Sequence, residues 1–462
     1  MLYRFKHDKF NDPKIFEDNR LRPRSYFIPF SSREACDKCD YLNERSSSDC
    51  VQVLSGEWDF VYYSKIGDMP DKIDFYDLKT DKVQVPSCWQ YTGYESPYYV
   101  NVRYQFDYKF PYVPADESTV GKNMPANDGK IHKVYNSIGV YRRRFEAKRG
   151  FKNFLTFLGA ASNVQVYLNG RYIGYGEGSH NTSEFDVTQF MLDGENELVV
   201  LVYKWCSGTY LESQDMFRSN GIFRDVYLTT HYGAYIWDIV TSVSRKGAVW
   251  TLSAEADVRG ENTSLEYVLE RAGRRIASVK ARAGKASFEI EQPDLWSAET
   301  PALYMLYAVL KKGSKTVECI RQEVGFKEIA IDGNVYLFNG KPIKFKGVNH
   351  HDTDESKGYV MNAFDYLKDA MLMKEYNVNA VRTSHYPPDP VFIKIANYIG
   401  LYIIDEADIE THGASARKNF YTPNAISNHT PWKDFYWDRV YRMYERDKNN
   451  PCVSMWSLGN EA

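Results

Sequence analysis

The sequence predicts a multidomain protein in which two antiparallel β-sandwiches precede the first half of a parallel α/β barrel. Short alternating strands with turn residues between them fill the chain from Gly56 to His231. The same alternation continues to Phe326 without a helical period, and after Ile329 strand and helix patterns alternate. A chain of 462 residues is also long enough for about three domains.

Residues 1–50 are polar, and we expect an extended arm that lies on the rest of the chain. Residues 51–230 contain repeated short strands, of which GEWDFVYY (56–63) and NELVVLVYKW (196–205) are typical. Asn169-Gly170 predicts a type I′ hairpin, because that turn requires positive φ at both central residues. Repeated strands of this kind indicate an antiparallel β-sandwich.

Residues 231–328 predict an immunoglobulin-like β-sandwich. Their strands are short and alternating, as in TLSAEADV (251–258) and LYMLYAVL (303–310), and no helix pattern interrupts them. This region has no polar cluster that suggests chemistry, so we expect it to act as a spacer.

Residues 329–462 predict a partial barrel. Apolar residues at helical spacing indicate helices over 365–376, 390–399 and 432–447. The expected strands are 343–348, 378–383, 401–405 and 453–458. Right-handed crossovers between parallel strands make a barrel the natural form, and four strands are half of an eight-stranded one.

Composition excludes several classes of partner. Lys and Arg total 58 against 61 Asp and Glu, and a net charge of -3 gives no reason to expect nucleic acid or an anionic membrane. The N-terminus has no apolar signal core, and no apolar run is long enough to span a membrane. The charge balance instead favours a small, neutral partner. Seven cysteines without a closely spaced framework indicate reduced thiols, so we expect a cytoplasmic protein.

Polar side chains follow all four predicted strands. The carboxyl ends of parallel barrel strands meet at one rim, so we expect these side chains to converge there. Four of the nine histidines lie between residues 350 and 412, each just past a strand end. In strand order, the rim residues are Asn349, His350, His351 and Asp352; Arg382, Ser384 and His385; Glu406, Asp408, Glu410 and His412; Asn460 and Glu461.

Two kinds of chemistry suit such a rim. Carboxylates can provide the acid/base and nucleophile pair that glycoside cleavage requires. Alternatively, Glu410-x-His412 places two ligands on one side of an extended segment, and Glu461 can supply a third. Oxygen ligands with a single imidazole favour magnesium or manganese over structural zinc.

Six segments that follow one another along the chain carry a family resemblance. They are PSCWQYTGYESPYYVNVRYQF (86–106), GTYLESQDMFRSNGIFRDVYL (208–228), FNGKPIKFKGVNHHD (338–352), NVNAVRTSHYP (377–387), GLYIIDEADIETHG (400–413) and RDKNNPCVSMWSLGNEA (446–462). Together they resemble the β-galactosidases of glycoside hydrolase family 2. The resemblance implies a jelly-roll sugar-binding domain over 51–230, an immunoglobulin-like domain over 231–328 and a TIM-barrel catalytic domain over 329–462.

The resemblance also implies roles for individual residues. Glu461 resembles the general acid/base of a retaining enzyme, and Asn460 the residue that holds the 2-hydroxyl of the sugar. Glu461 would protonate the glycosidic oxygen while a second carboxylate attacks the anomeric carbon. The implied magnesium ligands are Glu410, His412 and Glu461, and the implied substrate contacts are Asn101, His351, Arg382, His385 and Asn460.

Two departures from the family pattern limit what this chain is expected to do. Ser207 stands where the family commonly has an aspartate that contacts galactose and a sodium ion, which puts the sodium site in doubt. The family's nucleophilic glutamate belongs near the end of the seventh barrel strand, whereas four strands are predicted here. We therefore expect this chain by itself to be inactive.

The expected substrates are terminal β-D-galactosides such as lactose, and β-glucuronides or β-mannosides are the alternative within the family. A different class of function is also open. The chain could be a non-catalytic sugar-binding fragment, or a split subunit that needs a second, complementing C-terminal chain. A homo-oligomer is a further possible assembly.

Overall fold

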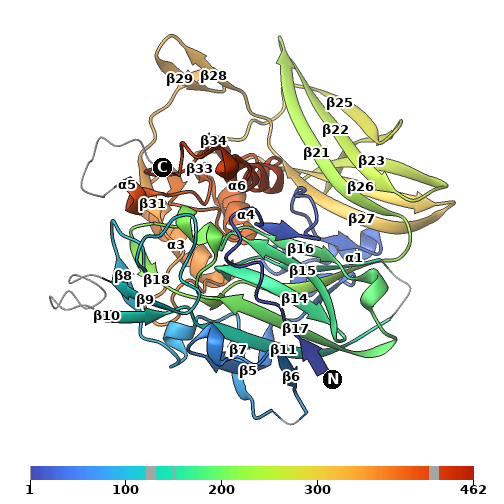
Figure 1. The fold of residues 1–462 in the computed structure, drawn as a ribbon. Coiled ribbons are helices and arrows are strands. Elements are labelled where there is room, and N and C mark those ends of the chain that lie inside the picture. Colours follow the sequence, from blue (N-terminus) through green and yellow to red (C-terminus); the bar gives the residue numbers. More distant parts are fainter. Residues whose placement is uncertain (1, 77, 121–131, 149–151, 416–425) are drawn as a thin grey trace.

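The computed structural model describes residues 2–76, 78–120, 132–148, 152–415 and 426–462. These residues form two antiparallel β-sandwiches and a four-stranded parallel sheet with helices, and the predicted fold class is confirmed (Figure 1). No helix within these ranges is long and apolar enough to cross a bilayer.

The first sandwich pairs a seven-stranded sheet, in the order β2-β15-β14-β17-β11-β5-β7, with a four-stranded sheet, β16-β12-β20-β4. Four two-stranded pairs, β1-β6, β10-β9, β13-β19 and β18-β8, surround it. The strand bounds are β1 Leu2–Arg4, β2 Glu17–Asp18, β4 Val51–Val53, β5 Gly56–Tyr63, β6 Lys72–Asp74, β7 Asp81–Val85, β8 Tyr98–Val100, β9 Glu117–Val120, β10 His132–Tyr135, β11 Ile138–Ala147, β12 Lys152–Phe157, β13 Ala160–Ala161, β14 Asn163–Leu168, β15 Arg171–Glu177, β16 Ser183–Asp186, β17 Gly194–Tyr203, β18 Met216–Arg218, β19 Gly221–Ile222 and β20 Val226–His231.

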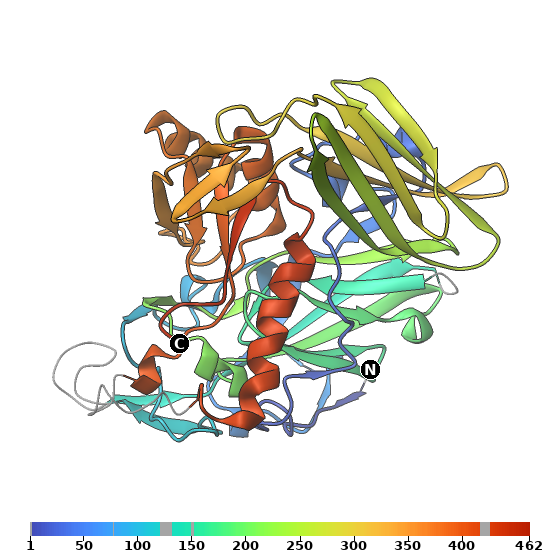
Figure 2. The ribbon, with the colours of Figure 1, turned by 90° about the horizontal axis from the view of Figure 1, so that it is seen from above.

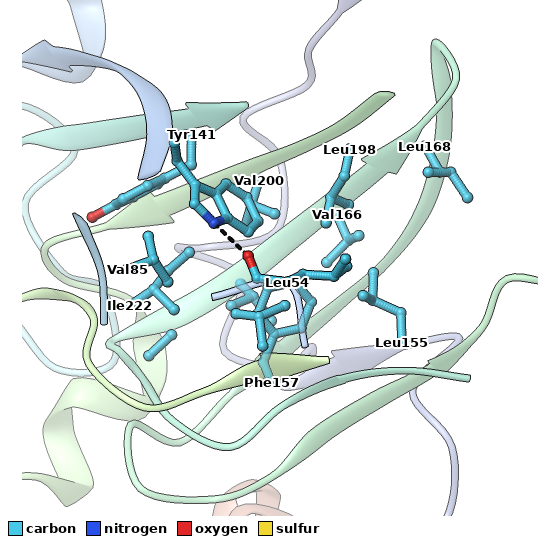
Figure 3. Packing of buried hydrophobic residues seen from close by; sticks show 14 of the residues in the cluster. Leu54, Val85, Tyr141, Leu155, Phe157, Val166, Leu168, Leu198, Val200 and Ile222 are labelled. Atoms are coloured by element: carbon cyan, nitrogen blue, oxygen red, sulfur yellow. Dashed lines mark hydrogen bonds between the residues drawn. The ribbon is translucent and has the colours of Figure 1, made fainter. Parts of the chain in front are cut away.

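A core of aliphatic and aromatic side chains joins the two sheets (Figure 3). Leu198 and Val200 of β17 face Leu155 and Phe157 of β12 within this cluster, and all four are at most 1% exposed. The predicted hairpin is confirmed, because Leu168 pairs with Arg171 and both turn residues have positive φ, 52° at Asn169 and 78° at Gly170.

The N-terminal arm is built into the sheets of the two sandwiches. Its strand β2 pairs with β15 of the first sandwich, and β3 (Pro29–Phe30) pairs with β27 of the second. Two short helices follow, α1 (Arg33–Asp37) and α2 (Glu44–Ser47). The expectation that the arm lies on the rest of the chain is therefore confirmed, and the arm also ties the two sandwiches together.

The second sandwich consists of a three-stranded sheet, β21-β22-β25, and a five-stranded sheet, β24-β23-β26-β27-β3. Its inner faces bury an apolar cluster that includes Trp250, Tyr267 and Phe326. The strands are β21 Tyr235–Lys246, β22 Val249–Arg259, β23 Thr263–Arg271, β24 Arg274–Lys280, β25 Lys285–Glu291, β26 Tyr304–Lys312 and β27 Lys315–Val324.

The C-terminal part holds a small antiparallel sheet and then the parallel sheet β31-β32-β33-β34. The antiparallel strands are β28 Ile329–Asp332, β29 Val335–Phe338 and β30 Lys341–Pro342, and the parallel strands are β31 Gly347–His350, β32 Ala380–Thr383, β33 Tyr402–Glu406 and β34 Val453–Ser457. The helices are α3 Ala363–Glu375, α4 Pro390–Ile399, α5 His412–Ser415 and α6 Lys433–Asp447.

The first parallel strand was predicted at 343–348, and this placement is wrong. The strand begins at Gly347. The residues before it do not continue the strand, because their backbone groups hydrogen-bond to the side chain of Asn379. Its Oδ1 accepts a hydrogen bond from the Lys346 amide at 2.7 Å, and its Nδ2 donates to the Lys344 carbonyl at 3.0 Å. The other strands and helices lie within about two residues of their predicted positions.

Helix α6 joins the parallel sheet to the first sandwich. It runs along the junction between them, and the C-terminus lies beside α5 in both views (Figures 1 and 2). Arg439 of α6 donates to the Gly208 carbonyl, and Arg442 donates to the Leu21 carbonyl of the arm. The rim of the parallel sheet is therefore assembled against the first sandwich.

Replacing Leu198 by Ala is expected to lower the free energy of unfolding by about 2–5 kcal/mol, because it leaves a cavity between the two sheets. Urea unfolding followed by tryptophan fluorescence measures this. Leu192→Ala is the matched control, since Leu192 is 42% exposed and its loss should change stability by about 0.5 kcal/mol or less. Equal effects of the two substitutions would contradict the assignment of the core.

Candidate active site

The carboxyl ends of the four parallel strands bring the predicted rim residues together. In the strand register, Asn349 lies opposite Arg382, and Glu406 lies opposite Ser457. Not every rim residue faces the site. His350 pairs with Asp369 at 2.9 Å and stacks on Phe392, which makes it part of the helix packing.

The end of β33 and the residues that follow it carry four acidic side chains in six residues. Asp405, Glu406, Asp408 and Glu410 are all 0% exposed. A buried carboxylate is stable only when cations and hydrogen-bond donors compensate for its lost hydration, or when it takes up a proton. The partners of each acid therefore define what this segment can do.

Glu406 is fully compensated. Its oxygens accept hydrogen bonds from Arg382 Nε at 2.7 Å and Nη2 at 2.9 Å, and from Ser457 Oγ at 2.6 Å. His385 Nδ1 lies 2.7 Å from Glu406 Oε1. Burial raises the pKa of Glu406, but these hydrogen bonds outweigh burial and hold it below its usual range. Glu406 is thus ionised, His385 Nδ1 donates to it, and the side chains of Arg382 and His385 are both fixed at the rim.

The burial of the Asp405 and Asp408 carboxyl groups is compensated in different ways. Burial and repulsion from Asp447 raise the pKa of Asp405 well above its usual range, so this carboxyl is held protonated. Asp408 accepts from Gln214 Nε2 at 2.9 Å and pairs with Arg439 Nη1 at 3.2 Å. Burial would raise the pKa of Asp408, but Arg439 and then His180 lower it below its usual range.

Glu410 has the least compensation of the four acids. Its Oε2 accepts from Asn460 Nδ2 at 2.9 Å, whereas its buried Oε1 has no hydrogen-bond partner among the described residues. Burial raises the pKa of Glu410 to about 7, and the neighbouring Glu461 carboxylate adds to the rise. A positive charge beside Oε1 would complete the site.

Glu410, His412 and Glu461 have the geometry of a cation site. One ligand atom from each lies within 4.8 Å of the others, and the described part of the chain contains no other such group of three His, Cys, Asp or Glu residues. His412 Nδ1 lies 2.5 Å from Glu461 Oε2. Two carboxylates and one imidazole, with an unpartnered oxygen in Glu410, fit a divalent cation of the magnesium and manganese type.

Glycine allows the strand end to approach Glu410. Gly459 has φ 134°, and a Cβ there would lie 2.6 Å from the Ile409 carbonyl oxygen. The close approach lets the Asn460 amide donate to that carbonyl at 2.9 Å. The Asn460 side chain then bridges two rim residues, because its Oδ1 accepts from Arg382 at 2.9 Å while its Nδ2 reaches Glu410.

His351 presents a neutral imidazole to the site. Its Nδ1 lies 3.1 Å from the Tyr386 hydroxyl, and the Tyr386 ring stacks on His180 at 3.6 Å. Burial, and then the nearby His385, lower the pKa of His351 to about 4. A neutral ring can donate and accept hydrogen bonds at neutral pH, which suits a sugar hydroxyl.

The two residues predicted from the first sandwich are placed differently. Asn101 is exposed at the end of β8, which pairs with β18, whose buried Arg218 acts electrostatically on Glu410. Asn101 therefore lies on the surface of the sandwich, without a hydrogen bond to the described rim residues. Ser207 is 0% exposed, and its Oγ has no partner among the described residues. It lies in a buried 3-10 helix (Ser207–Leu211) rather than on an open surface.

Sequence reasoning missed several residues that shape this site. Tyr386, His180, Gln214 and Arg439 touch the rim residues or the buried acids. Tyr386 follows the predicted His385 directly, so its place near the rim could have been expected. The other three come from a different domain or from a helix, and no local pattern marks them.

Known protein families match all three parts of the chain. Residues 51–124 and 120–232 match the sugar binding domain of glycosyl hydrolases family 2, and residues 222–327 match a second domain of that family. Residues 329–462 match its TIM barrel domain.

Curated relatives are named β-galactosidases. The protein from Actinobacillus pleuropneumoniae is 35% identical over 481 residues, which cover 98% of this chain and 45% of the relative. The protein from Priestia megaterium is also 35% identical, and the match covers 98% of this chain and 45% of that relative. The chain thus spans about 45% of the length of the curated relatives it matches.

Solved structures share the fold at lower identity. The β-glucuronidase of Bifidobacterium dentium, complexed with coumarin-3-O-glucuronide, has a TM-score of 0.67 at 23% identity, covering 89% of this chain and 68% of that one. A β-glycosidase from Bacteroides vulgatus has a TM-score of 0.69 at 23% identity, with coverages of 89% and 50%.

The pKa of Glu410 predicts a pH-dependent effect of Glu410→Gln on the cation-free chain. Between pH 4.5, its ordinary value, and about 7, the folded chain holds a proton that the unfolded chain has lost. The free energy of unfolding of the wild type therefore falls across this window, whereas Gln does not titrate. The stability advantage of Glu410→Gln should grow by on the order of 3 kcal/mol from pH 4.5 to 7 and then level off.

Urea unfolding in the presence of a chelator, repeated between pH 4.5 and 8, measures this difference. Glu299→Gln removes an exposed carboxylate of the second sandwich and corrects for the general effect of losing one negative charge. An advantage of Glu410→Gln that does not change with pH would show that burial does not perturb this carboxyl.

Proposed function

Because the chain belongs to glycoside hydrolase family 2, we propose that it provides the acid/base part of a retaining glycosidase that cleaves terminal β-D-galactosides such as lactose. The observation that carries this proposal is the convergence of Glu461, Glu410 and His412 at the rim of the parallel sheet. The rim adds Arg382 and His385, both fixed by Glu406, and the neutral imidazole of His351.

In the proposed reaction, Glu461 is the general acid. It donates its proton to the glycosidic oxygen as the bond to the anomeric carbon breaks, and a second carboxylate forms a bond to that carbon. Glu461 then takes a proton from water, which attacks the glycosyl-enzyme and releases the sugar. Its half-exposed side chain, with an exposed fraction of 50%, leaves room for substrate and water.

We propose that Glu410, His412 and Glu461 hold a magnesium ion when it is bound. The ion would supply positive charge beside Glu461 and Glu410, which favours the ionised form of both carboxylates. Sodium is not part of the proposal, because the residue at the expected position, Ser207, is neutral and fully buried.

The preference for galactose rests on two supports. The curated relatives at 35% identity are named β-galactosidases, and the segments that carry the family motifs supply His351, His385, Arg382 and Asn460 to the rim. The solved structures named β-glucuronidases are 20–23% identical and support the fold alone. A β-glucuronide or β-mannoside is therefore the second candidate substrate.

We further propose that the parallel sheet is completed by a second set of strands, from a complementing C-terminal chain or within a homo-oligomer. Strands β31 and β34 are the edges of the described sheet. Exposed apolar side chains lie on or just past these edges, namely Val348, Trp456 and Leu458. Unpaired apolar edges favour the addition of further strands.

A cytoplasmic location is proposed because all seven cysteines are free thiols.

Binding and turnover by the purified chain test this proposal together. In the presence of magnesium it should bind a phenyl thio-β-D-galactoside more tightly than the corresponding thio-β-glucuronide, as measured by calorimetry. His385→Ala should weaken the binding about tenfold or more, because it removes a hydrogen-bonding group at the rim and leaves Glu406 without one of its partners. The chain alone should not hydrolyse o-nitrophenyl β-D-galactoside.

His7→Ala is the control, since His7 lies in the arm and contacts Tyr203 rather than the rim. Tighter binding of the glucuronide would replace the galactoside proposal with its alternative. Measurable, metal-dependent hydrolysis by the chain alone would show that another of its carboxylates attacks the anomeric carbon.

A further inference from the structure

Arg439 of α6 contacts both the first sandwich and the segment that carries Glu410. Its Nη1 donates to the Asp408 carbonyl at 2.6 Å and pairs with the Asp408 carboxylate at 3.2 Å. Its Nη2 donates to the Gly208 carbonyl at 2.9 Å and pairs with Glu212 at 2.9 Å. The residue is only 3% exposed, so these contacts form in the absence of competing water.

The two segments that Arg439 joins also form a short parallel bridge at Glu410. The Glu410 amide donates to the Leu211 carbonyl at 2.7 Å, and the Ser213 amide donates to the Glu410 carbonyl at 3.0 Å. Three residues further along, the Gly413 amide donates to Ser213 Oγ at 2.9 Å. The backbone from Glu410 to Gly413 is therefore positioned by a loop of another domain.

Close packing on the sandwich side depends on Gly208. A Cβ at this position would lie 2.6 Å from Glu177 Oε2 and 2.8 Å from Arg439 Nη2. The Gly208 amide donates to Glu177 at 2.6 Å, so Glu177 packs against the same loop that Arg439 contacts. The buried carboxylates of Asp408 and Glu212 both pair with Arg439, and its loss would leave them without their cationic partner.

We infer that Arg439 is a positioning residue for the cation site: it fixes the loop 208–213 of the first sandwich against residues 408–413, and so sets the position of Glu410. This inference rests on the proposed cation site. Residues that orient metal ligands from outside the ligand set commonly change metal affinity by about 10-fold to 100-fold when they are replaced.

Arg442 of the same helix gives a matched comparison. It is 6% exposed, and its Nη2 pairs with Glu17 at 2.6 Å and its Nε with Asp438 at 2.7 Å. It faces the N-terminal arm rather than residues 408–413. A purely structural role for Arg439 predicts that Lys at either position destabilises the fold without changing cation affinity.

The experiment is a titration of the full chain with Mn²⁺, followed by the loss of the electron paramagnetic resonance signal of the free ion. Arg439→Lys should raise the Kd for Mn²⁺ about tenfold or more, because Lys has no planar group that reaches two carbonyls and two carboxylates together. Arg442→Lys should leave the Kd unchanged, while both variants lower the melting temperature.

A second pair of variants avoids the risk that Arg439→Lys does not fold. Glu212→Gln removes one anionic partner of Arg439 and should weaken Mn²⁺ binding by a smaller factor, whereas Glu17→Gln, which removes a partner of Arg442, should not. Unchanged Mn²⁺ affinity in the Arg439 and Glu212 variants, or equal losses of affinity in the Arg442 and Glu17 variants, would overturn the positioning role of Arg439. Either result would leave the proposed cation site standing. An unmodified chain that does not bind Mn²⁺ would overturn the cation site and the inference with it.

Discussion

The burial of four carboxylates between Asp405 and Glu410 is the constraint on which the candidate active site depends. Each buried acid requires a proton, a cation or several donors. Asp405 is held protonated beside Asp447. Glu406 accepts hydrogen bonds from Arg382 and His385. Asp408 forms an ion pair with Arg439. Compensating these acids therefore also orients the side chains that face the rim.

Glu410 is the exception among these four buried acids. Only the Asn460 amide donates to its carboxylate, and its Oε1 has no hydrogen-bond partner among the described residues. A site built for stability alone would supply a cationic side chain here. His412 and Glu461 each place one ligand atom within 4.8 Å of a Glu410 carboxylate oxygen, which supports the proposed cation site.

The sequence could predict much of this structure where the signals are local. Helix α4 was predicted at its observed bounds, since Asp389 caps its first turn and Gly400 ends it in a left-handed conformation. The start of β31 was missed because it depends on Asn379, more than thirty residues away. Glu410 and His412 were found from their spacing and family resemblance, but Arg439 was not. Its role requires a loop 231 residues distant in the chain, which no local pattern reveals.

The buried acidic segment and the strand end are together proposed to form a divalent cation site. Crystals of the chain soaked in Mn²⁺ test it most directly by anomalous scattering near the manganese edge. A peak is expected within coordination distance of Glu410, His412 and Glu461. A map with no peak between these three side chains, or with peaks only at other carboxylates, would contradict it.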